Sequence, residues 1–468
     1  MTNANQQTFD VTNPFDESIF ATVAETTEAQ AFDALECAVQ LYRNRDGWLG
    51  AQARIEILKR FAGLVTEQTE ALALQAAREG GKPLKDSLVE IRRAIQGVEV
   101  AIEEIGKLHG TEVPMGLTDS STQRFAHTFR EPRGVVLAVS AFNHPFNLII
   151  HQAITAVAAG CPVLVKPSRD TPLSAISVVN LLHEAGLPRG WCELITCADE
   201  VTTKIICDCR VSFLTFIGSS KVGWYLRSKL AAGATCALEH GGAAPVIIDA
   251  TADVKDSIPL LVRGGFYHAG QVCVSVQRIY VHEKVATEFA NDFVAAAEQL
   301  ITGDQLNGDT DVGPLIRPQE VERVHAWVQE AVQAGATLLC GGRKISATTY
   351  APTVLWNPPE SAQVSQKEIF GPVVAIYTFE NLDDAIARAN RPDLFFQASI
   401  FTRDLNTALL ASRRLHGMAV MVNDHSAFRV DWMPFGGHRQ SGLGIGGIGH
   451  SMKDMTLERM VVFRSSVL

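Results

Sequence analysis

Apolar residues recur at spacings of three and four over much of the first hundred positions. The pattern covers residues 26–44, 51–78 and 84–108. Because this spacing repeats about once per helical turn, it gives each segment one apolar face and one polar face. We therefore predict three long amphipathic helices in the amino-terminal part of the chain.

The pattern changes at Gly134, where short unbroken apolar runs begin to alternate with helical segments. Residues 134–139 form one such run, as expected of a strand that is buried on both faces. Further strands are predicted at 162–166 and 211–216, and helices at 145–159, at 171–185 and from about residue 221. This alternation predicts a doubly wound parallel sheet that binds ligands at the carboxyl ends of its strands.

A second α/β unit is predicted to begin near Pro245. Its first strand, at 245–248, is followed by a helix at about 253–268. Later strands are expected at 278–282, 373–378, 396–401 and 418–422, and later helices at 318–334 and 382–390. No internal repeat or long linker stands out, so we expect the two units to pack closely with a cleft between them.

Length and charge narrow the class of protein. A chain of 468 residues is too long for one ordinary core, so two or three domains are expected. The net charge of −10 argues against a nucleic-acid surface, which must neutralise phosphates. No apolar run reaches about 18 residues, so no membrane span is predicted.

The amino terminus and the cysteines indicate a cytoplasmic protein. Residues 1–7 lack the charged and apolar regions of a signal peptide, and the nine scattered cysteines are typical of reduced thiols. Cys207 and Cys209 are too close together for a zinc ribbon, and the histidines form no cluster with the spacing of metal ligands. No metal site is predicted.

Four short segments carry the candidate chemistry. Asn143 directly follows the first predicted strand, where a side-chain amide would project at the sheet edge. Gly218 and Ser219 lie between a strand and a helix, where backbone N–H groups suit a pyrophosphate. Glu239 precedes two glycines, and Cys273 ends a Gly-Gln-Val-Cys turn.

Each of these residues has an ordinary structural alternative. Asn143 alone could be a helix cap, Glu239 a surface carboxylate, and Cys273 a small buried apolar residue. The order and spacing of all four segments together favour the functional interpretation.

With these motifs in hand, the chain resembles the NAD(P)-dependent aldehyde dehydrogenase superfamily over nearly its whole length, and in particular its lactaldehyde dehydrogenase-like branch. Further matching motifs lie at 166–168, 368–372, 422–423 and 434–442, and Glu239 precedes Cys273 by 34 residues. The resemblance implies an α/β fold with a Rossmann-type NAD(P)-binding domain (1–112 and 134–241) and a second α/β catalytic domain (242–445). Segments 113–133 and 446–468 would form a small β oligomerisation extension.

The resemblance also implies roles for individual residues. Cys273 would attack the aldehyde, Asn143 and the backbone N–H of Cys273 would hold the oxyanion, and Glu239 would activate the water that hydrolyses the thioester. The matching cofactor residues bind the adenosine ribose, the pyrophosphate and the nicotinamide ribose; they are Lys166 with Ser168, then Gly218, Ser219 and Gly223, and finally Glu368 with Phe370 beside it.

Three positions depart from the family pattern. Arg169 stands where relatives that prefer NAD often carry a glutamate, and a cation there could attract a 2′-phosphate. We therefore expect NADP to be accepted, with the order of preference between NADP and NAD left open; the alternative is that Arg169 points to solvent. His240 replaces a usual leucine and His268 a common asparagine, and neither is assigned a function.

Candidate substrate residues indicate a short polar or anionic aldehyde, such as lactaldehyde, glyceraldehyde phosphate or a sulfo- or phosphono-aldehyde. His144 and His151 lie seven residues apart where relatives acting on long aldehydes tend to carry aromatic residues. Arg429 could pair with an anionic group, and Phe428 would keep an apolar wall. The alternatives are that the histidines satisfy local backbone groups and that Arg429 pairs with Asp424 or Asp431.

The sequence leaves other functions and the state of assembly open. An acylating enzyme would release the thioester to coenzyme A, but such relatives usually lack the glutamate that Glu239 matches. A catalytically silent structural relative need not keep Asn143, Glu239, Cys273 and Glu368 together. The apolar strand predicted at 460–464 has few partners in its own domain, so we expect self-association as a dimer or tetramer.

Overall fold

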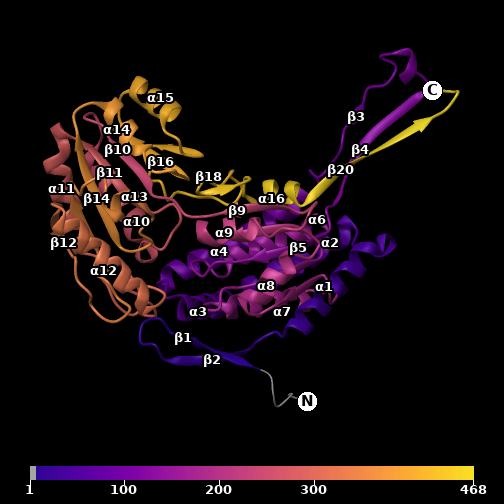
Figure 1. Ribbon diagram of the computed structural model, residues 1–468, viewed down its shortest axis with the longest axis horizontal. Coiled ribbons are helices and arrows are strands. Elements are labelled where there is room, and N and C mark those ends of the chain that lie inside the picture. The colour runs from indigo at the N-terminus through magenta and orange to yellow at the C-terminus, as the bar shows by residue number, and fades with distance from the viewer. Residues whose placement is uncertain (1–6) are drawn as a thin grey trace.

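The computed structural model describes residues 7–468 and contains two α/β units with an arm projecting from them (Figure 1). Residues 1–6 lie outside the described part. They include most of the segment examined for a signal peptide and the start of the segment expected at 1–112. Among residues 7–468, no helix combines the length and the apolar character needed to cross a membrane.

The first unit is built on a six-stranded sheet of order β19-β9-β8-β5-β6-β7. Its five longer strands run parallel, which confirms the predicted doubly wound arrangement, and only β19 is antiparallel, to β9. The strands are β5 (Val135–Val139), β6 (Val163–Lys166), β7 (Cys192–Leu194), β8 (Val211–Ile217), β9 (Thr235–Glu239) and β19 (Gly442–Leu443).

Helices cover both faces of this sheet, and most of the predicted ones are present. They are α1 (Glu28–Arg43), α2 (Ala51–Glu67), α3 (Thr69–Gly80), α4 (Leu84–Ile105), α6 (Thr155–Ala159), α7 (Pro172–Glu184), α8 (Asp199–Ile206) and α9 (Ser220–Arg227). Two apolar cores result, one on each face of the sheet, and burying one large aliphatic or aromatic side chain there contributes about 1.5–3 kcal/mol.

Two predicted helices are interrupted. The helix expected at 51–78 breaks at Gln68 into α2 and α3, where the hydroxyls of Thr66 and Thr69 donate to backbone carbonyls of the preceding turn. The helix expected at 145–159 contains a wide π-turn over Ile150–Ile154, between α5 (Asn147–Ile149) and α6. Such turns are rare and are often found at functional sites.

The second unit is built on a seven-stranded sheet of order β12-β13-β14-β11-β10-β16-β17, in which only β12 is antiparallel to its neighbour. The strands are β10 (Ala244–Ile248), β11 (Val276–His282), β12 (Thr337–Cys340), β13 (Thr353–Trp356), β14 (Val373–Phe379), β16 (Gln397–Phe401) and β17 (Ala419–Val422). The helices are α10 (Val254–Phe266), α11 (Glu283–Glu298), α12 (Pro318–Gln333), α13 (Gln363–Gln366), α14 (Leu382–Ala389) and α15 (Leu405–Arg414).

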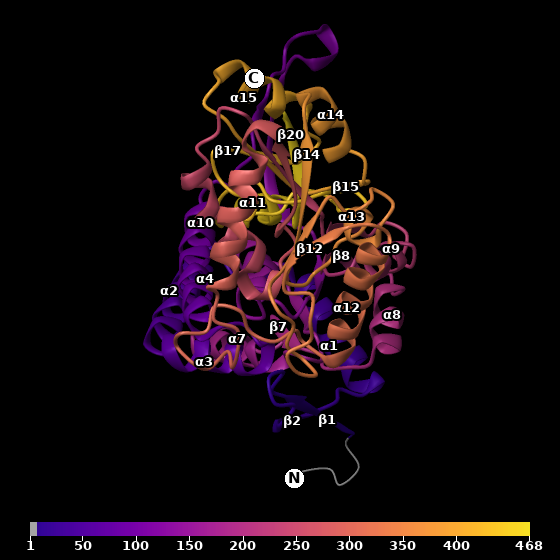
Figure 2. The same cartoon turned by 90° about the vertical axis from the view of Figure 1, so that its left-hand side faces the viewer.

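A β-hairpin that the sequence pattern does not predict precedes α1 and lies at the edge of the molecule (Figures 1 and 2). Its strands are β1 (Thr8–Thr12) and β2 (Ile19–Ala24). On the side of the first unit, the hydroxyl of Thr196 donates to the carbonyl of Ala24 at 2.7 Å. On the side of the second unit, Gln305 Nε2 donates to Asn13 Oδ1 at 2.7 Å. The hairpin therefore connects the two units.

The arm contains β4 (Arg124–Pro132) and β20 (Thr456–Arg464), with the short β3 (Glu112–Val113) beside β4 (Figure 1). The strand expected at 460–464 is longer than predicted and pairs with β4 over all nine of its residues. Its partner is thus in the same chain, and its other edge is open because the sheet order is β20-β4-β3. The helix α16 (Ile448–Asp454) packs against α4 and α6, and the short strands β15 (Leu394–Phe395) and β18 (His438–Arg439) pair with each other.

Candidate active site

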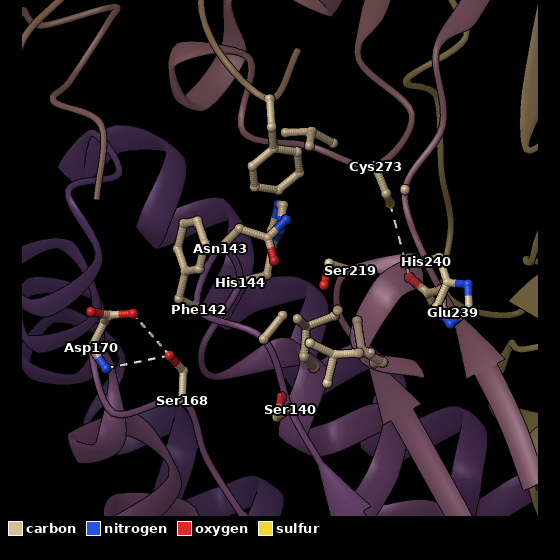
Figure 3. A pocket seen from close by; sticks show the side chains of 18 of the residues that line it. Ser140, Phe142, Asn143, His144, Ser168, Asp170, Ser219, Glu239, His240 and Cys273 are labelled. Carbon is tan, nitrogen blue, oxygen red and sulfur yellow. Dashed lines mark hydrogen bonds between the residues drawn. The ribbon is translucent and has the colours of Figure 1, made fainter. Parts of the chain in front are cut away.

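A cavity of about 1430 Å³ is lined by residues of both units and of the amino-terminal hairpin. Its walls include the carboxyl ends of β5, β8 and β9, where a doubly wound sheet binds its ligands. Figure 3 shows Asn143, Ser219, Glu239 and Cys273 around this space. The cleft expected between the two units is therefore present, and the four candidate segments meet in it.

The turn that presents Cys273 has an unusual backbone. Helix α10 ends at Phe266, two residues before the predicted end, because Tyr267 leaves the helical conformation with ψ of 130°. His268 and Ala269 then adopt the left-handed conformation with φ of 49° and 53°. Gly270 follows with φ of 70°, and a Cβ there would lie 2.1 Å from the carbonyl oxygen of Gly371. A non-glycine residue in this region costs about 1–3 kcal/mol, so the surrounding contacts must hold the turn in place.

Gln271 supplies such contacts. Its amide oxygen accepts from the backbone N–H of Ile316 at 3.0 Å, and its Nε2 donates to the carbonyl of Pro314 at 3.2 Å. Two residues later, Cys273 is half-buried, with Val272 and Val274 packed into a small apolar cluster.

Cys273 and Glu239 face each other across the cavity, with Sγ 3.9 Å from Oε1 (Figure 3). Burial raises the pKa of the Cys273 thiol well above its usual value, and the charge of Glu239 raises it further. Burial also raises the pKa of Glu239, while Arg429 opposes that shift. The carboxylate is therefore a stronger base than an exposed glutamate, and its neighbour is a protonated thiol.

Asn143 lies close to the same turn. Its Nδ2 donates to the carbonyl of Gln271 at 2.9 Å, which uses one of the two amide hydrogens. The backbone around it is held by a fully buried ion pair between Lys82 and Glu90. Glu90 Oε1 accepts from the N–H of Phe146 at 3.0 Å and from that of Asn147 at 2.9 Å.

Lys82 and Glu90 were not singled out from the sequence. The sequence does hold an indication of this pair, because Glu90 lies on the apolar stripe of α4, four residues before the fully buried Ala94. A charge at such a position is costly unless it is paired and hydrogen-bonded, so it marks a specific partner.

The other end of the cavity holds most of the residues expected to bind a cofactor. Lys166 ends β6 and its Nζ lies 2.8 Å from Asp199 Oδ1, while Ser168 Oγ lies 3.2 Å from Asp170 Oδ2. Ser219 is the N-cap residue of α9 and its side chain points toward the cavity (Figure 3). The cavity wall includes Lys166, Ser168, Arg169, Gly218, Ser219, Glu368 and Phe370.

Gly223 is placed differently from the other predicted cofactor residues, because it is not among those that line the cavity. A Cβ at this position would lie 1.9 Å from Nε2 of His240. The His240 ring packs edge-on against Trp224 and Phe216, and its Nδ1 lies 2.9 Å from the carbonyl of Gln440. The histidine that replaces the usual leucine therefore fills space against a glycine of α9.

Glu368 is half-buried beside the Gly241–Gly242 segment. Its Oε1 accepts from the N–H of Gly242 at 3.2 Å, and burial raises the pKa of its carboxyl to about 8. A Cβ on Gly241 would lie 1.9 Å from this carboxyl group, so the chain approaches it closely. Phe370 has φ of 49° and contacts Phe142 edge-on.

Arg169 does not point freely into solvent. Its Nη1 lies 3.2 Å from Oε2 of Glu25, and its guanidinium stacks on the ring of Phe9 at 4.3 Å. Both partners belong to the amino-terminal hairpin segment, which the sequence pattern did not bring to the site.

The substrate candidates separate into two layers. His144, Phe428 and Arg429 line the cavity, whereas His151 is buried behind it, with Nε2 at 2.7 Å from Asp431 Oδ1 and at 3.4 Å from Nη2 of Arg429. His151 is thus not among the residues that line the cavity, because its ring turns toward Asp431. Burial lowers the pKa of both His144 and His151, so neither imidazole carries a charge at neutral pH.

Arg429 forms neither of the ion pairs considered for it, with Asp424 or with Asp431. Asp431 instead binds Arg93, and within residues 7–468 Arg429 forms no ion pair closer than 4 Å. Its guanidinium lies 3.5 Å from the ring centroid of Phe435, and its Nε is buried without a hydrogen-bond partner among the described residues. It is a cation in the wall of the cavity without a direct ion pair among the described residues, although the carboxylates of Glu239 and Asp431 are near enough for its charge to lower their pKa.

Across positions 7–468 no three His, Cys, Asp or Glu side chains are grouped so that they could hold an ion. His268 is fully buried beside His144, with the two rings edge-on and their centroids 6.1 Å apart.

The whole-chain comparisons agree with the site. The model of the aldehyde dehydrogenase family matches residues 1–461, and the chain belongs to this family. It is 37% identical over 454 residues to a 3-sulfolactaldehyde dehydrogenase of Priestia aryabhattai, covering 97% of this chain and 94% of that one. It is 34% identical over 463 residues to a lactaldehyde dehydrogenase of Methanocaldococcus jannaschii, covering 98% of each.

A solved structure extends the likeness to three dimensions. The glyceraldehyde-3-phosphate dehydrogenase of Methanocaldococcus jannaschii, crystallised with NADP, superposes with a TM-score of 0.93 at 33% identity. The match covers 99% of this chain and 100% of that structure. The predicted family and fold class are thereby confirmed.

Proposed function

We propose that this protein oxidises an aldehyde to a carboxylic acid with NAD(P)⁺ and water, through a thioester on Cys273. The observation that carries the proposal is the convergence of a thiol, a carboxylate 3.9 Å from it and a side-chain amide on one cavity. No single one of these groups would suffice, because the reaction needs a nucleophile, an oxyanion donor and a base.

In the proposed reaction, Sγ of Cys273 forms a bond to the aldehyde carbon and the thiol proton leaves to solvent, so that Glu239 stays ionised. The carbonyl electron pair moves onto oxygen, where the second amide hydrogen of Asn143 and the backbone N–H of Cys273 stabilise it. Loss of a hydride leaves a thioester. Glu239 then takes a proton from water, which attacks the thioester; the C–S bond breaks and the acid leaves.

The chemistry that a bound nicotinamide cofactor supplies is acceptance of that hydride. Lys166, Ser168 and Arg169 would hold its adenosine end, and Gly218 with Ser219 its pyrophosphate. The fit is supported by α9, which presents its N-terminus and the Ser219 side chain to the cavity. Glu368 and Phe370 would contact the nicotinamide ribose, while Gly223 would act indirectly, by leaving room for His240 to pack against α9.

The proposed substrate is a short polar or anionic aldehyde. Arg429 is the main support, because a guanidinium in a cavity wall that forms no direct ion pair with a described residue can bind a carboxylate, phosphate or sulfonate. The names of the relatives agree, since sulfolactaldehyde and glyceraldehyde 3-phosphate are both anionic and short. His144 and Phe428 complete this wall as a neutral polar group and an apolar one.

Two alternatives are less well supported. Transfer to coenzyme A does not require a water-activating base, yet Glu239 faces Cys273 directly. A silent structural relative would not need the buried Lys82–Glu90 pair that holds the Asn143 segment.

The proposal extends to the organisation of the protein. Residues 1–112 and 134–241 would bind the cofactor, 242–445 would supply the nucleophile, and 113–133 with 446–468 would mediate self-association as a dimer or tetramer. The open edge of β20 supports an assembly of this kind. All nine cysteines are free, which agrees with a cytoplasmic location.

The test is an assay of NAD(P)H formation and of the product with lactaldehyde, glyceraldehyde 3-phosphate, sulfolactaldehyde, a long alkanal and benzaldehyde. We expect free acid with or without coenzyme A, the highest kcat/KM for an anionic aldehyde, and no turnover by Cys273→Ala. Acyl-coenzyme A as the product, or equal turnover of the long alkanal, would contradict the proposal.

A further inference from the structure

The amino-terminal hairpin forms part of the wall at the adenosine end of the cavity. Phe9, Asp10 and Thr12 of β1 line the cavity together with Lys166 and Arg169. The hairpin is fixed there at both ends, through Thr196 and Ala24 on one unit and through Gln305 and Asn13 on the other. These contacts hold the hairpin beside the residues expected to bind the cofactor.

One pair of side chains links the hairpin to the cofactor residues. Glu25, directly after β2, lies 3.2 Å from the guanidinium of Arg169, and Phe9 stacks on the same guanidinium at 4.3 Å. The side chain of Glu25 is only 16% exposed, whereas that of Arg169 is 44% exposed and lines the cavity. Arg169 is thus held between a ring and a carboxylate with one side left open to a ligand.

The other cations at this end are also neutralised. Lys166 pairs with Asp199 at 2.8 Å, and Arg317 pairs with Asp170 at 2.7 Å. Among the described residues that line the adenosine end, every cation therefore already has a carboxylate partner. A 2′-phosphate that binds Arg169 brings two negative charges close to Glu25, which opposes its binding.

We propose that Glu25 is a specificity-determining residue that weakens binding of a 2′-phosphorylated adenosine by competing for Arg169. The inference rests on the proposed function only in placing the adenosine of the cofactor beside Lys166. NAD⁺, which has a 2′-hydroxyl, leaves the Glu25–Arg169 pair intact. NADP⁺ binds Arg169 only by sharing it with Glu25 or displacing it.

The experiment measures binding without an aldehyde, so that it is independent of catalysis. Dissociation constants of the full chain are determined by calorimetry for NADP⁺, NAD⁺, adenosine 2′,5′-bisphosphate and AMP, at low and high salt. In Glu25→Gln we expect Kd to fall about five- to tenfold for the two 2′-phosphorylated ligands and to change less than twofold for the other two. The gain shrinks at high salt because screening weakens the repulsion, an effect that a purely structural role would not produce.

Two further variants make the result specific. Glu28, on α1, forms an exposed ion pair with Lys204 on α8. Glu28→Gln therefore removes a similar carboxylate, and we expect it to leave all four dissociation constants unchanged. Arg169→Gln combined with Glu25→Gln removes the gain, because the group for which Glu25 competes is absent. The inference is overturned if the ratio of the Kd for NADP⁺ to the Kd for NAD⁺ in Glu25→Gln stays within twofold of the wild-type ratio.

The two proposals fail in different ways. A chain that binds these nucleotides with the expected changes but oxidises no aldehyde overturns the proposed reaction and leaves the role of Glu25 standing. A wild-type chain that binds neither adenosine 2′,5′-bisphosphate nor AMP overturns the placement of the adenosine, and the role of Glu25 with it.

Discussion

The carboxylate of Asp431 accepts two hydrogen bonds from the guanidinium of Arg93, at 2.8 and 3.1 Å. The imidazole of His151 adds a third contact at 2.7 Å to Oδ1. Because burial lowers the pKa of His151, that ring is a neutral hydrogen-bond donor, and the balancing charge comes from Arg93. The segment that carries Arg429 is thus joined to α4 and to the π-turn.

Asp431→Asn should destabilise the protein by about 3 kcal/mol or more at neutral pH, since it removes one partner of a buried ion pair. Burial disfavours the charged form of Asp431, but the hydrogen bond from His151 and the nearby charges outweigh it, so its pKa lies below the ordinary value of 3.8. The stabilisation is therefore present above pH 3.8 and is lost as the pH falls below it. Urea unfolding of both proteins at pH 7 and pH 2.5 measures this; a difference that does not shrink at pH 2.5 contradicts the assignment.

Glu239→Gln should separate the two halves of the reaction. Hydride transfer precedes hydrolysis, so we expect a burst of about one NAD(P)H per site and then a steady rate lower by about 10²–10⁴-fold. Rapid mixing with detection of NAD(P)H measures both phases. In the wild type, burial raises the pKa of Glu239, so hydrolysis should decline as the pH falls through a value above 4.5. An unchanged steady rate in Glu239→Gln would exclude its role as the base.

Arg429→Met should impair anionic aldehydes selectively. Loss of a charge-assisted hydrogen bond costs about 1.5–3 kcal/mol, which corresponds to about a 10- to 150-fold lower kcat/KM for such substrates. A neutral aldehyde of similar length should change less than threefold. Arg413→Met, on the exposed surface of α15, is the matched control. Equal losses for charged and neutral aldehydes would show that Arg429 acts only through the fold.

Gly223→Ala should destabilise the protein by about 1–3 kcal/mol, because the new methyl group overlaps Nε2 of His240. His240→Ala in the same chain creates room for it, so the double variant should be more stable than the sum of the single changes predicts. Thermal or urea unfolding of the four proteins in this double-mutant cycle gives the coupling. Additive effects would contradict the contact between the two residues.

Self-association should depend on the apolar side chains of β20. Met460, Val462 and Phe463 are each about half exposed, on a strand with one open edge. Replacing Met460 and Val462 by glutamate should convert the assembly to smaller species in light scattering after size exclusion, while circular dichroism stays unchanged. An unaltered mass would place the subunit contact elsewhere.

Periodic segments were predictable from the sequence because their signal is local. The helices α1, α4, α7 and α12 and the strands β5, β6 and β8 lie within a few residues of the expected bounds. The break between α2 and α3 was not predicted, because the side-chain hydrogen bonds of Thr66 and Thr69 compete with a pattern that is otherwise continuous. The hairpin β1–β2 was missed because its short strands are mostly exposed and carry little periodicity.

Contacts between distant residues account for most of what the sequence left undecided at the site. Arg93 and Asp431 are 338 positions apart, and Arg169 and Glu25 are 144 apart. Such pairs have no local pattern, so Arg429 could equally have been paired with Asp431 and Arg169 could have pointed to solvent. The motif residues Asn143, Glu239 and Cys273 were identifiable because their order along the chain is itself informative.

The left-handed turn before Cys273 bears on what the sequence motif means. Residues 268–270 have a left-handed backbone conformation that an isolated peptide would not keep. They keep it here because the surrounding chain packs closely against the turn. Grafting residues 266–275 onto another scaffold would transfer the amino-acid sequence of the motif but not its backbone conformation. The reactivity of the thiol therefore belongs to the assembled fold, and a match to the motif in an unrelated chain carries little weight.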